Sequence, residues 1–248
     1  MEPVVPALVA RDADAHHLLS QSLPARIDRY LHDKPPPPQD RATNPRLIAL
    51  TFDDGPYPVE TPLLLDVLAD LHVPATFFLI GNDAEQFPAL VRRIAQGGHE
   101  IANHTQTHPA DFQALSAAEV KTELDDGAQT LERYARDPAI RTLMRPPHGR
   151  FTEATVRAAQ LDGYDVVLWD DDPGDWRVMT PDAIATHVEE DAAAPDIVLL
   201  HSGRLSTIEA LPNLVARFRA AGFTFVTVGK LRARVPLGQI LHPAKFRV

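Results

Sequence analysis

From Arg46 onward, short apolar runs alternate with segments of helical periodicity. A short apolar run bounded by turn residues predicts a buried strand, and apolar positions three or four apart predict an amphipathic helix. These patterns predict about seven strands, which are Leu47–Phe52, Ala75–Ile80, His99–Ala102, a short strand ending at Leu143, Tyr164–Trp169, Ile197–Leu200 and Phe223–Val228. The helices predicted between them are Thr61–Leu71, Ala84–Gln96, Ser116–Arg136, Thr152–Leu161, Pro181–Asp191 and Ser206–Ala221.

Strands that alternate with helices indicate a parallel sheet covered by helices, either as a barrel or as an open doubly wound sheet. No Gly-x-Gly-x-x-Gly motif and no phosphate loop follows the first predicted strand. Nucleotide-binding versions of this architecture are therefore disfavoured.

Residues 1–45 have a different character. A predicted helix around Ala25–His32 is followed by Pro35–Pro38, and four consecutive prolines end a helix and favour a stiff, extended linker. We therefore predict an N-terminal extension over residues 1–45, one domain over 46–231 and a C-terminal tail over 232–248.

Chemically reactive side chains gather at the carboxyl ends of the predicted strands. In parallel α/β barrels, active sites are built on this face. The residues are Asp53 and Asp54 after the first strand, His104 and His108 after the third, Arg145 and His148 after the fourth, Asp170, Asp171, Asp172 and Asp175 after the fifth, and His201 after the sixth.

Each of these groups has a plainer interpretation when taken alone. Asp53-Asp54-Gly55-Pro56 can be only a turn, and two histidines four residues apart are commonly unrelated surface residues. Adjacent carboxylates repel each other, however, unless a cation compensates. If residues 104–108 are helical, both imidazoles lie on one face and can bind one metal ion. One carboxylate and two histidines leave open positions for water and substrate, which suits metal-assisted hydrolysis.

Composition narrows these possibilities. The chain has 248 residues and no cysteine, so any metal must be held by His, Asp or Glu. Its formal net charge of −10 argues against a protein that binds nucleic acid by neutralising phosphates. No apolar run approaches about 18 residues, so no membrane span is expected. No leader peptide is evident, and we expect a cytoplasmic protein or an exported one that has lost its leader.

Five sequence blocks resemble those of the polysaccharide deacetylases of the NodB-homology type, also called carbohydrate esterase family 4. The resemblance covers about Arg46 to Leu231. The blocks are Thr51-Phe52-Asp53-Asp54-Gly55-Pro56, His104-Thr105-Gln106-Thr107-His108, Arg145-Pro146-Pro147-His148-Gly149, Asp172-Pro173-Gly174-Asp175-Trp176 and Leu199-Leu200-His201.

The resemblance implies a distorted parallel (β/α) barrel of about seven strands in a single domain. It also implies a hydrolase that removes N-linked acetyl groups from an amino sugar in an oligosaccharide, a polysaccharide or a glycoconjugate. The expected cofactor is one divalent metal ion, Zn²⁺ in the first place, with Co²⁺, Ni²⁺ and Mn²⁺ as alternatives. The expected partner is an acetylated carbohydrate.

The family also implies a role for each matching residue. Asp54, His104 and His108 would be the metal ligands. Asp53 would be the general base, held and kept ionised by Arg145, and His201 would be the general acid, oriented by Asp175. Trp176 and Leu199 would line the pocket for the acetyl methyl group.

One position departs from the family pattern, because His148 stands where the family usually has tyrosine. Its backbone N–H can still stabilise an oxyanion, but the phenol's contact with substrate is lost, so a preference for chitin or peptidoglycan does not transfer directly.

The alternatives to a sugar N-deacetylase are a hydrolase of a non-sugar amide or cyclic imide, an O-acetyl esterase, and a non-catalytic carbohydrate-binding protein.

Overall fold

The structure, a computed structural model, describes residues 46–191 and 196–234. The predicted N-terminal extension, with its helix around Ala25–His32 and its prolines at 35–38, lies outside the described residues, as does most of the predicted C-terminal tail. The three-part division of the chain therefore stays a prediction. Within the described ranges, no helix is long and apolar enough to cross a membrane.

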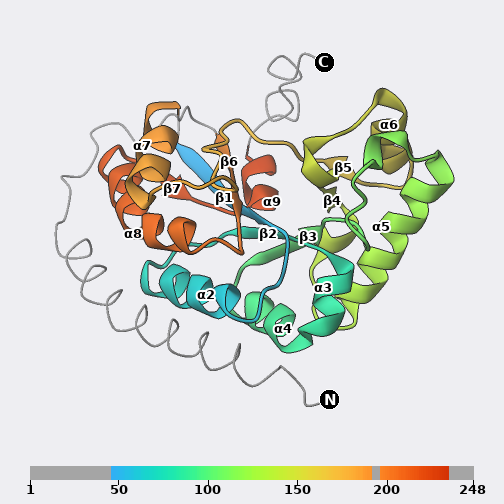
Figure 1. The fold of residues 1–248 in the computed structure, drawn as a ribbon, viewed down its shortest axis with the longest axis horizontal. Coiled ribbons are helices and arrows are strands. Elements are labelled where there is room, and N and C mark those ends of the chain that lie inside the picture. The colour runs from blue at the N-terminus through green and yellow to red at the C-terminus, as the bar shows by residue number, and fades with distance from the viewer. Residues whose placement is uncertain (1–45, 192–195, 235–248) are drawn as a thin grey trace, which may run out of the picture.

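A curled parallel sheet forms the centre of the molecule (Figure 1). Its strand order is β5-β4-β3-β2-β1-β6, and β7 pairs with the beginning of β1. The strands are β1 (Leu47–Asp53), β2 (Thr76–Leu79), β3 (Glu100–Asn103), β4 (Leu143–Met144), β5 (Asp165–Val166), β6 (Asp196–His201) and β7 (Thr224–Phe225).

The segment after β5 closes the sheet into a distorted barrel. The Asp170 N–H donates to the Ile197 carbonyl at 2.9 Å, and the Leu199 N–H donates to the Asp171 carbonyl at 2.9 Å. These bonds join the two ends of the strand order through a single bridge rather than through a regular strand pair. The prediction of a single-domain, distorted parallel (β/α) barrel is confirmed.

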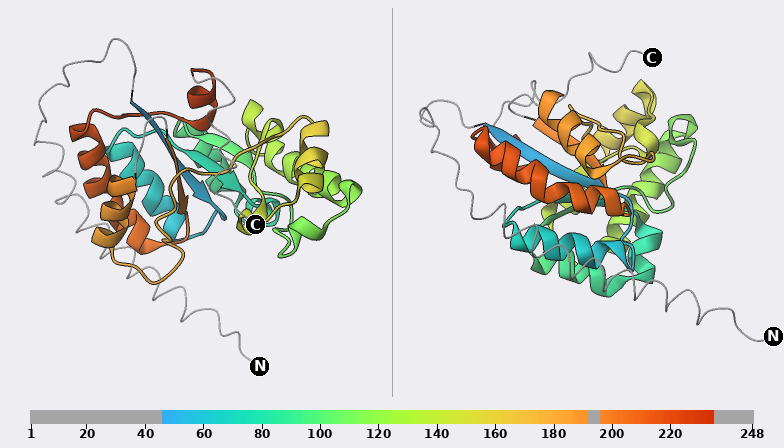
Figure 2. Two further views of the ribbon diagram at one scale, coloured as in Figure 1. Left: turned by 90° about the horizontal axis from the view of Figure 1, so that it is seen from above. Right: turned by 60° about the vertical axis from the view of Figure 1, so that its left-hand side comes forward.

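Helices surround the sheet, with α7 beside α8 at one end and α5 beside α6 at the other (Figure 2). They are α2 (Glu60–Asp70), α3 (Gly81–Gln86), α4 (Pro88–Gln96), α5 (Ala117–Glu132), α6 (Glu153–Leu161), α7 (Pro181–Asp191), α8 (Leu205–Ala220) and α9 (Val228–Arg232). Short 3₁₀ turns are η1 (Phe112–Ala114), η2 (Pro138–Arg141) and η3 (Pro147–Gly149).

Several predicted elements differ from the structure in their bounds, and two of these differences have a clear local cause. The helix predicted over Ala84–Gln96 is two helices, which meet at Phe87 with non-helical backbone angles. Proline disfavours a helical conformation in the residue before it, and Pro88 therefore begins a new helix. The strand predicted over Phe223–Val228 ends early, because Thr227 caps the N-terminus of α9.

The alternation of side chains along β1 separates two parts of the core. Ile48, Leu50 and Phe52 pack in the large cluster between sheet and helices. Ala49 packs in the smaller cluster that contains interior residues of several strands. Because successive side chains of a strand point to opposite faces, Asp53 lies on the same face as Ala49, at the carboxyl end of the barrel interior.

The burial of α2 against the core predicts that Leu64→Ala strongly lowers the stability of the fold. Leu64 is fully buried in the cluster between sheet and helices, and alanine in its place leaves a cavity. The free energy of unfolding, measured by urea denaturation, should fall by about 2–5 kcal/mol. Leu161→Ala in α6 is the matched control, because Leu161 is 81% exposed, and it should change stability by less than about 0.5 kcal/mol. Equal effects of the two changes would contradict this packing.

Candidate active site

A cavity of about 460 Å³ opens at the carboxyl ends of the strands, within the range of small-ligand sites. Of the predicted site residues, Arg145 and Asp175 are fully buried behind its wall, and the other eight line it. The complete lining is Asp53, Asp54, His104, His108, His148, Gly149, Arg150, Trp169, Asp172, Trp176, Leu199, His201 and Arg204.

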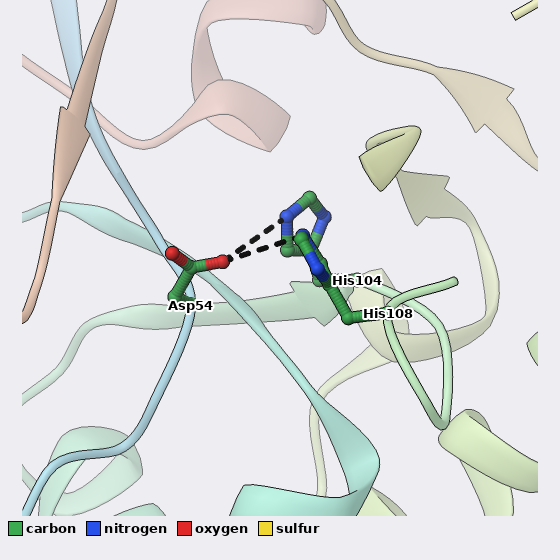
Figure 3. Close-up of side chains that lie close together, drawn as sticks. All are labelled: Asp54, His104 and His108. Atoms are coloured by element: carbon green, nitrogen blue, oxygen red, sulfur yellow. Dashed lines mark ion pairs between the residues drawn. The ribbon is translucent and has the colours of Figure 1, made fainter. Parts of the chain in front are cut away.

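Asp54, His104 and His108 form a candidate metal-binding triad (Figure 3). Asp54 Oδ1 lies 3.6 Å from His104 Nε2 and 3.5 Å from His108 Nε2. Nitrogen and oxygen ligands placed tetrahedrally around Zn²⁺ lie about 3.3 Å apart, from metal–ligand distances of about 2.0–2.2 Å. The spacing of the three ligand atoms therefore fits one small divalent cation.

The two histidines converge from a loop rather than from a helix. Residues 104–108 follow β3 without helical structure, so the helical spacing considered for the pair is wrong. Thr105 and His108 both have positive φ, at 68° and 54°. The Asn103 carboxamide oxygen accepts from the Thr105 N–H at 2.8 Å, and the Thr105 hydroxyl accepts from the His108 N–H at 3.0 Å. These local hydrogen bonds hold the unusual conformation.

Glu123 of α5 supports the same loop from outside. Its carboxylate accepts from the backbone N–H groups of Gln106 and Thr107, at 3.0 and 2.9 Å, and from the Thr107 hydroxyl at 2.7 Å. Sequence reasoning missed Glu123, because nothing in the sequence between this loop and α5 indicates that the two pack together.

The hydrogen bonding and protonation of the histidines suit metal binding. His104 Nδ1 lies 2.8 Å from the Arg145 carbonyl, which can only accept, so Nδ1 carries the proton and the Nε2 lone pair faces the triad. Burial lowers the pKa of His108 to about 4. A neutral imidazole is the form that binds metal.

Arg145 holds Asp53 beside this triad. The guanidinium is fully buried and donates from Nη1 to Asp53 Oδ1 at 2.6 Å and to the Thr51 hydroxyl at 2.8 Å. The other Asp53 oxygen, Oδ2, lies 3.8 Å from His104 Nε2. One oxygen is thus anchored, and the other faces the triad.

His201 lies directly across from Asp53, because the two residues are paired in the register of β1 and β6. The ring nitrogen Nδ1 of His201 lies 2.7 Å from Asp175 Oδ1, and the backbone N–H of His201 donates to Asp175 Oδ2 at 2.8 Å. Burial opposes protonation of His201, but the hydrogen bond and negative charge of Asp175 outweigh it and raise the pKa of His201 above its usual value. Thr207 of α8 donates to Asp175 Oδ2 at 2.6 Å, a contact that the sequence did not reveal.

The rest of the cavity wall combines aromatic and cationic side chains. His148 packs edge-on against His108, with ring centroids 4.5 Å apart, and burial together with the charge of Arg150 lowers the pKa of His148. Trp176 is 46% exposed at the cavity and Leu199 is buried. Sequence reasoning missed three lining residues, Trp169, Arg150 and Arg204, of which Arg150 directly follows a recognised block.

The fold and the site together define a single-domain parallel α/β barrel with a carboxylate–histidine centre at the carboxyl ends of its strands. The chain belongs to the polysaccharide deacetylase family, whose family model matches residues 40–167. The resemblance found in the five sequence blocks is therefore confirmed.

Three relatives illustrate this membership. A peptidoglycan-N-acetylglucosamine deacetylase of Bacillus cereus is 40% identical over 195 residues, which cover 76% of this chain and 89% of the relative. A chitooligosaccharide deacetylase of Sinorhizobium fredii is 36% identical, with 71% and 87% covered. A solved structure of a deacetylase with substrate superimposes with a TM-score of 0.71 at 35% identity, and covers 80% of this chain and 96% of its own.

The triad predicts the effect of removing one ligand atom. His104→Ala should weaken Zn²⁺ binding by more than about 100-fold, since even residues behind the ligands contribute about 10- to 100-fold to metal affinity. Isothermal titration calorimetry after chelation would measure it. His72→Asn is the control, because it removes an exposed histidine whose positive φ asparagine tolerates. Unchanged affinity of His104→Ala would place the metal elsewhere.

Proposed function

We propose that the protein is a metal-dependent N-deacetylase, which hydrolyses the acetamido group of an amino sugar in an oligosaccharide, polysaccharide or glycoconjugate. One observation carries this proposal: an anchored carboxylate, Asp53, and a carboxylate-bound histidine, His201, flank the Asp54–His104–His108 triad in one cavity. The named activities of both curated relatives, each a saccharide deacetylase, support a saccharide substrate.

The triad would hold the metal through Asp54 Oδ1 and the Nε2 atoms of His104 and His108. A divalent cation bound there would polarise the carbonyl and lower the pKa of water toward about 7. One carboxylate and two imidazoles suit Zn²⁺ and also accept Co²⁺, Ni²⁺ or Mn²⁺.

Asp53 acts as the general base in this proposal. A base must lie within hydrogen-bond reach of the proton that it removes. Oδ2 of Asp53 faces the triad, while Oδ1 is engaged by Arg145. The buried guanidinium fixes the direction of the Asp53 carboxylate, which accepts the proton of the attacking water without binding the metal itself.

His201 acts as the general acid. An amine leaves an acyl carbon readily only when it is protonated. Because Asp175 engages Nδ1, Nε2 is the nitrogen of His201 that is available to donate a proton into the cavity. The raised pKa of His201 keeps the imidazole protonated closer to neutral pH, so the proton passes from Nε2 to the departing nitrogen.

The remaining residues bind and orient the substrate. The backbone N–H of His148 is the expected donor to the oxyanion of the tetrahedral intermediate, since Pro147 has none. Leu199 and Trp176, both at the cavity, would enclose the acetyl methyl group. The exposed face of Trp176 also offers a surface for a sugar ring.

The alternative substrates are an O-acetyl ester, a cyclic imide and another non-sugar amide. The Asp175–His201 pair distinguishes the ester from the amides. An alkoxide leaves more easily than an amine and depends less on a strong proton donor. A histidine whose pKa is raised by a buried carboxylate therefore favours amide hydrolysis.

Acetate release from N-acetylated sugars, O-acetylated xylan and a cyclic imide, with and without metal, would separate the alternatives. Absence of turnover on all of them would favour a carbohydrate-binding protein.

Asp53→Asn should lower kcat on an N-acetylated oligosaccharide by about 10²- to 10⁴-fold, the usual contribution of a general base. Zn²⁺ affinity should stay within a few-fold of wild type, because Asp53 is not in the triad. Acetate release and calorimetry would measure the two quantities. Asp126→Asn, at an exposed position of α5, is the control and should leave both unchanged. Near-normal activity of Asp53→Asn would show that another group is the base.

Asp175→Asn removes the charge that keeps His201 protonated, while the burial that opposes protonation remains. The pKa of His201 should fall, so the basic limb of the pH profile of kcat/KM should move to lower pH. We also expect kcat to fall by about 10²-fold or more.

Thr207→Val is the comparison for Asp175→Asn. It removes one hydrogen bond to Asp175 but keeps the carboxylate charge, so its basic limb should stay near that of wild type. An unmoved basic limb in Asp175→Asn would argue against His201 as the acid.

A further inference from the structure

Two arginines on the cavity wall have no part in the chemistry described above. Arg150 follows η3 and Arg204 directly precedes α8; both line the cavity and both are exposed. They therefore place two positive charges where a substrate enters.

Neither arginine is engaged by the protein in a way that explains its position. Arg150 Nη1 lies 3.4 Å from the Ala110 carbonyl, which is longer than a usual N–H···O hydrogen bond of about 2.7–3.2 Å. Within residues 46–191 and 196–234, neither Arg150 nor Arg204 forms an ion pair with a carboxylate.

The acidic residues of the cavity are already matched to other groups. Asp53 is bound to Arg145, and Asp54 faces the two histidines of the triad. Asp172 Oδ1 accepts from the Gly174 N–H at 2.8 Å. Within the described residues, none of these three carboxylates is therefore paired with Arg150 or Arg204.

Helix stability does not explain Arg204 either. It is the N-cap residue of α8 and makes no capping hydrogen bond with its side chain. Helix N-termini favour Ser, Thr, Asp or Asn at this position, and the helix dipole makes a cation there unfavourable. A residue that is poor for the helix but lies on the cavity wall is better explained by what enters the cavity.

We infer that Arg150 and Arg204 bind an oxyanion of the saccharide, a carboxylate or a phosphate close to the acetamido group that is removed. This inference rests on the proposed deacetylase function and names a class of substrate for it, an anionic N-acetylated saccharide. A guanidinium offers paired N–H donors that match carboxylate and phosphate oxygens. Exposed cations also attract an anionic substrate more strongly at low salt.

Matched substrates test the inference directly. The carboxylate pair is a peptide-free tetrasaccharide of alternating N-acetylglucosamine and N-acetylmuramic acid, and the same compound with its carboxyl groups methylated. The phosphate pair is chitotetraose with and without a 6-phosphate. The wild-type kcat/KM should be about 10- to 100-fold higher for the charged member of one pair, the value of one or two charge-assisted contacts. The pair with the larger ratio identifies the oxyanion.

Arg150→Gln and Arg204→Gln should each lower the ratio of charged to neutral kcat/KM, and the double change should bring it close to one. Arg157→Gln is the matched control, because Arg157 is exposed on α6 away from the cavity, and it should keep the wild-type ratio. Equal kcat/KM within both pairs, or a ratio unaffected by both changes, would overturn the inference and leave the deacetylase function standing.

If no substrate is hydrolysed, binding measurements still test oxyanion recognition separately from the deacetylase function. Calorimetry on Asp53→Asn would then compare each charged saccharide with its neutral partner. Tighter binding of the charged member that disappears in Asp53→Asn/Arg150→Gln/Arg204→Gln would support oxyanion recognition although the reaction had failed. Equal binding of both members would overturn it.

Discussion

The buried ion pair between Arg145 and Asp53 is the interaction on which the site depends. A fully buried guanidinium is tolerated only when it is neutralised and its donors are satisfied. Asp53 and Thr51 of β1 accept two of its hydrogen bonds, and the carbonyls of Val167 and Leu168 accept two more. One side chain thus joins β1, β4 and the segment after β5. Because the Arg145 carbonyl also faces His104 Nδ1, the same residue orients a candidate metal ligand.

Successive side chains of a strand point to opposite faces of the sheet, and this alternation decides where the Arg145–Asp53 pair can lie. Below it, the barrel interior is apolar, with Ala49, Phe78 and Ala102 in one cluster. The parallel register then places Asp53 beside His201 on the neighbouring strand, so the base and the acid of the proposed reaction open into the same cavity. The polar chemistry is confined to the carboxyl edge, where the cavity opens and where charged groups can meet substrate.

Family membership and substrate choice depend on different parts of the molecule. The blocks shared with polysaccharide deacetylases supply the triad, Asp53 and the Asp175–His201 pair. The cavity rim is formed by loop residues, among them His148, Arg150 and Arg204, and loops are where specificity varies on a common scaffold. His148 in place of the usual tyrosine, and two rim arginines without a carboxylate partner among the described residues, are the features on which the proposed substrate preference of this chain depends.

The sequence by itself determined the strand–helix alternation, because strand and helix periodicity are local signals. The barrel and the candidate triad were implied by the resemblance in the five motif blocks, which are local signals as well. A capping box of Ser116 and Glu119 begins α5, and it too depends only on residues three apart in the chain. Only the tertiary structure decided that His104 and His108 converge from a loop, because Glu123 and Asn103 hold that loop by contacts distant in sequence or specific to its conformation. Thr207 behind Asp175 and the arginines at the rim were likewise beyond sequence reasoning, since their roles follow from which loops the closed barrel brings together.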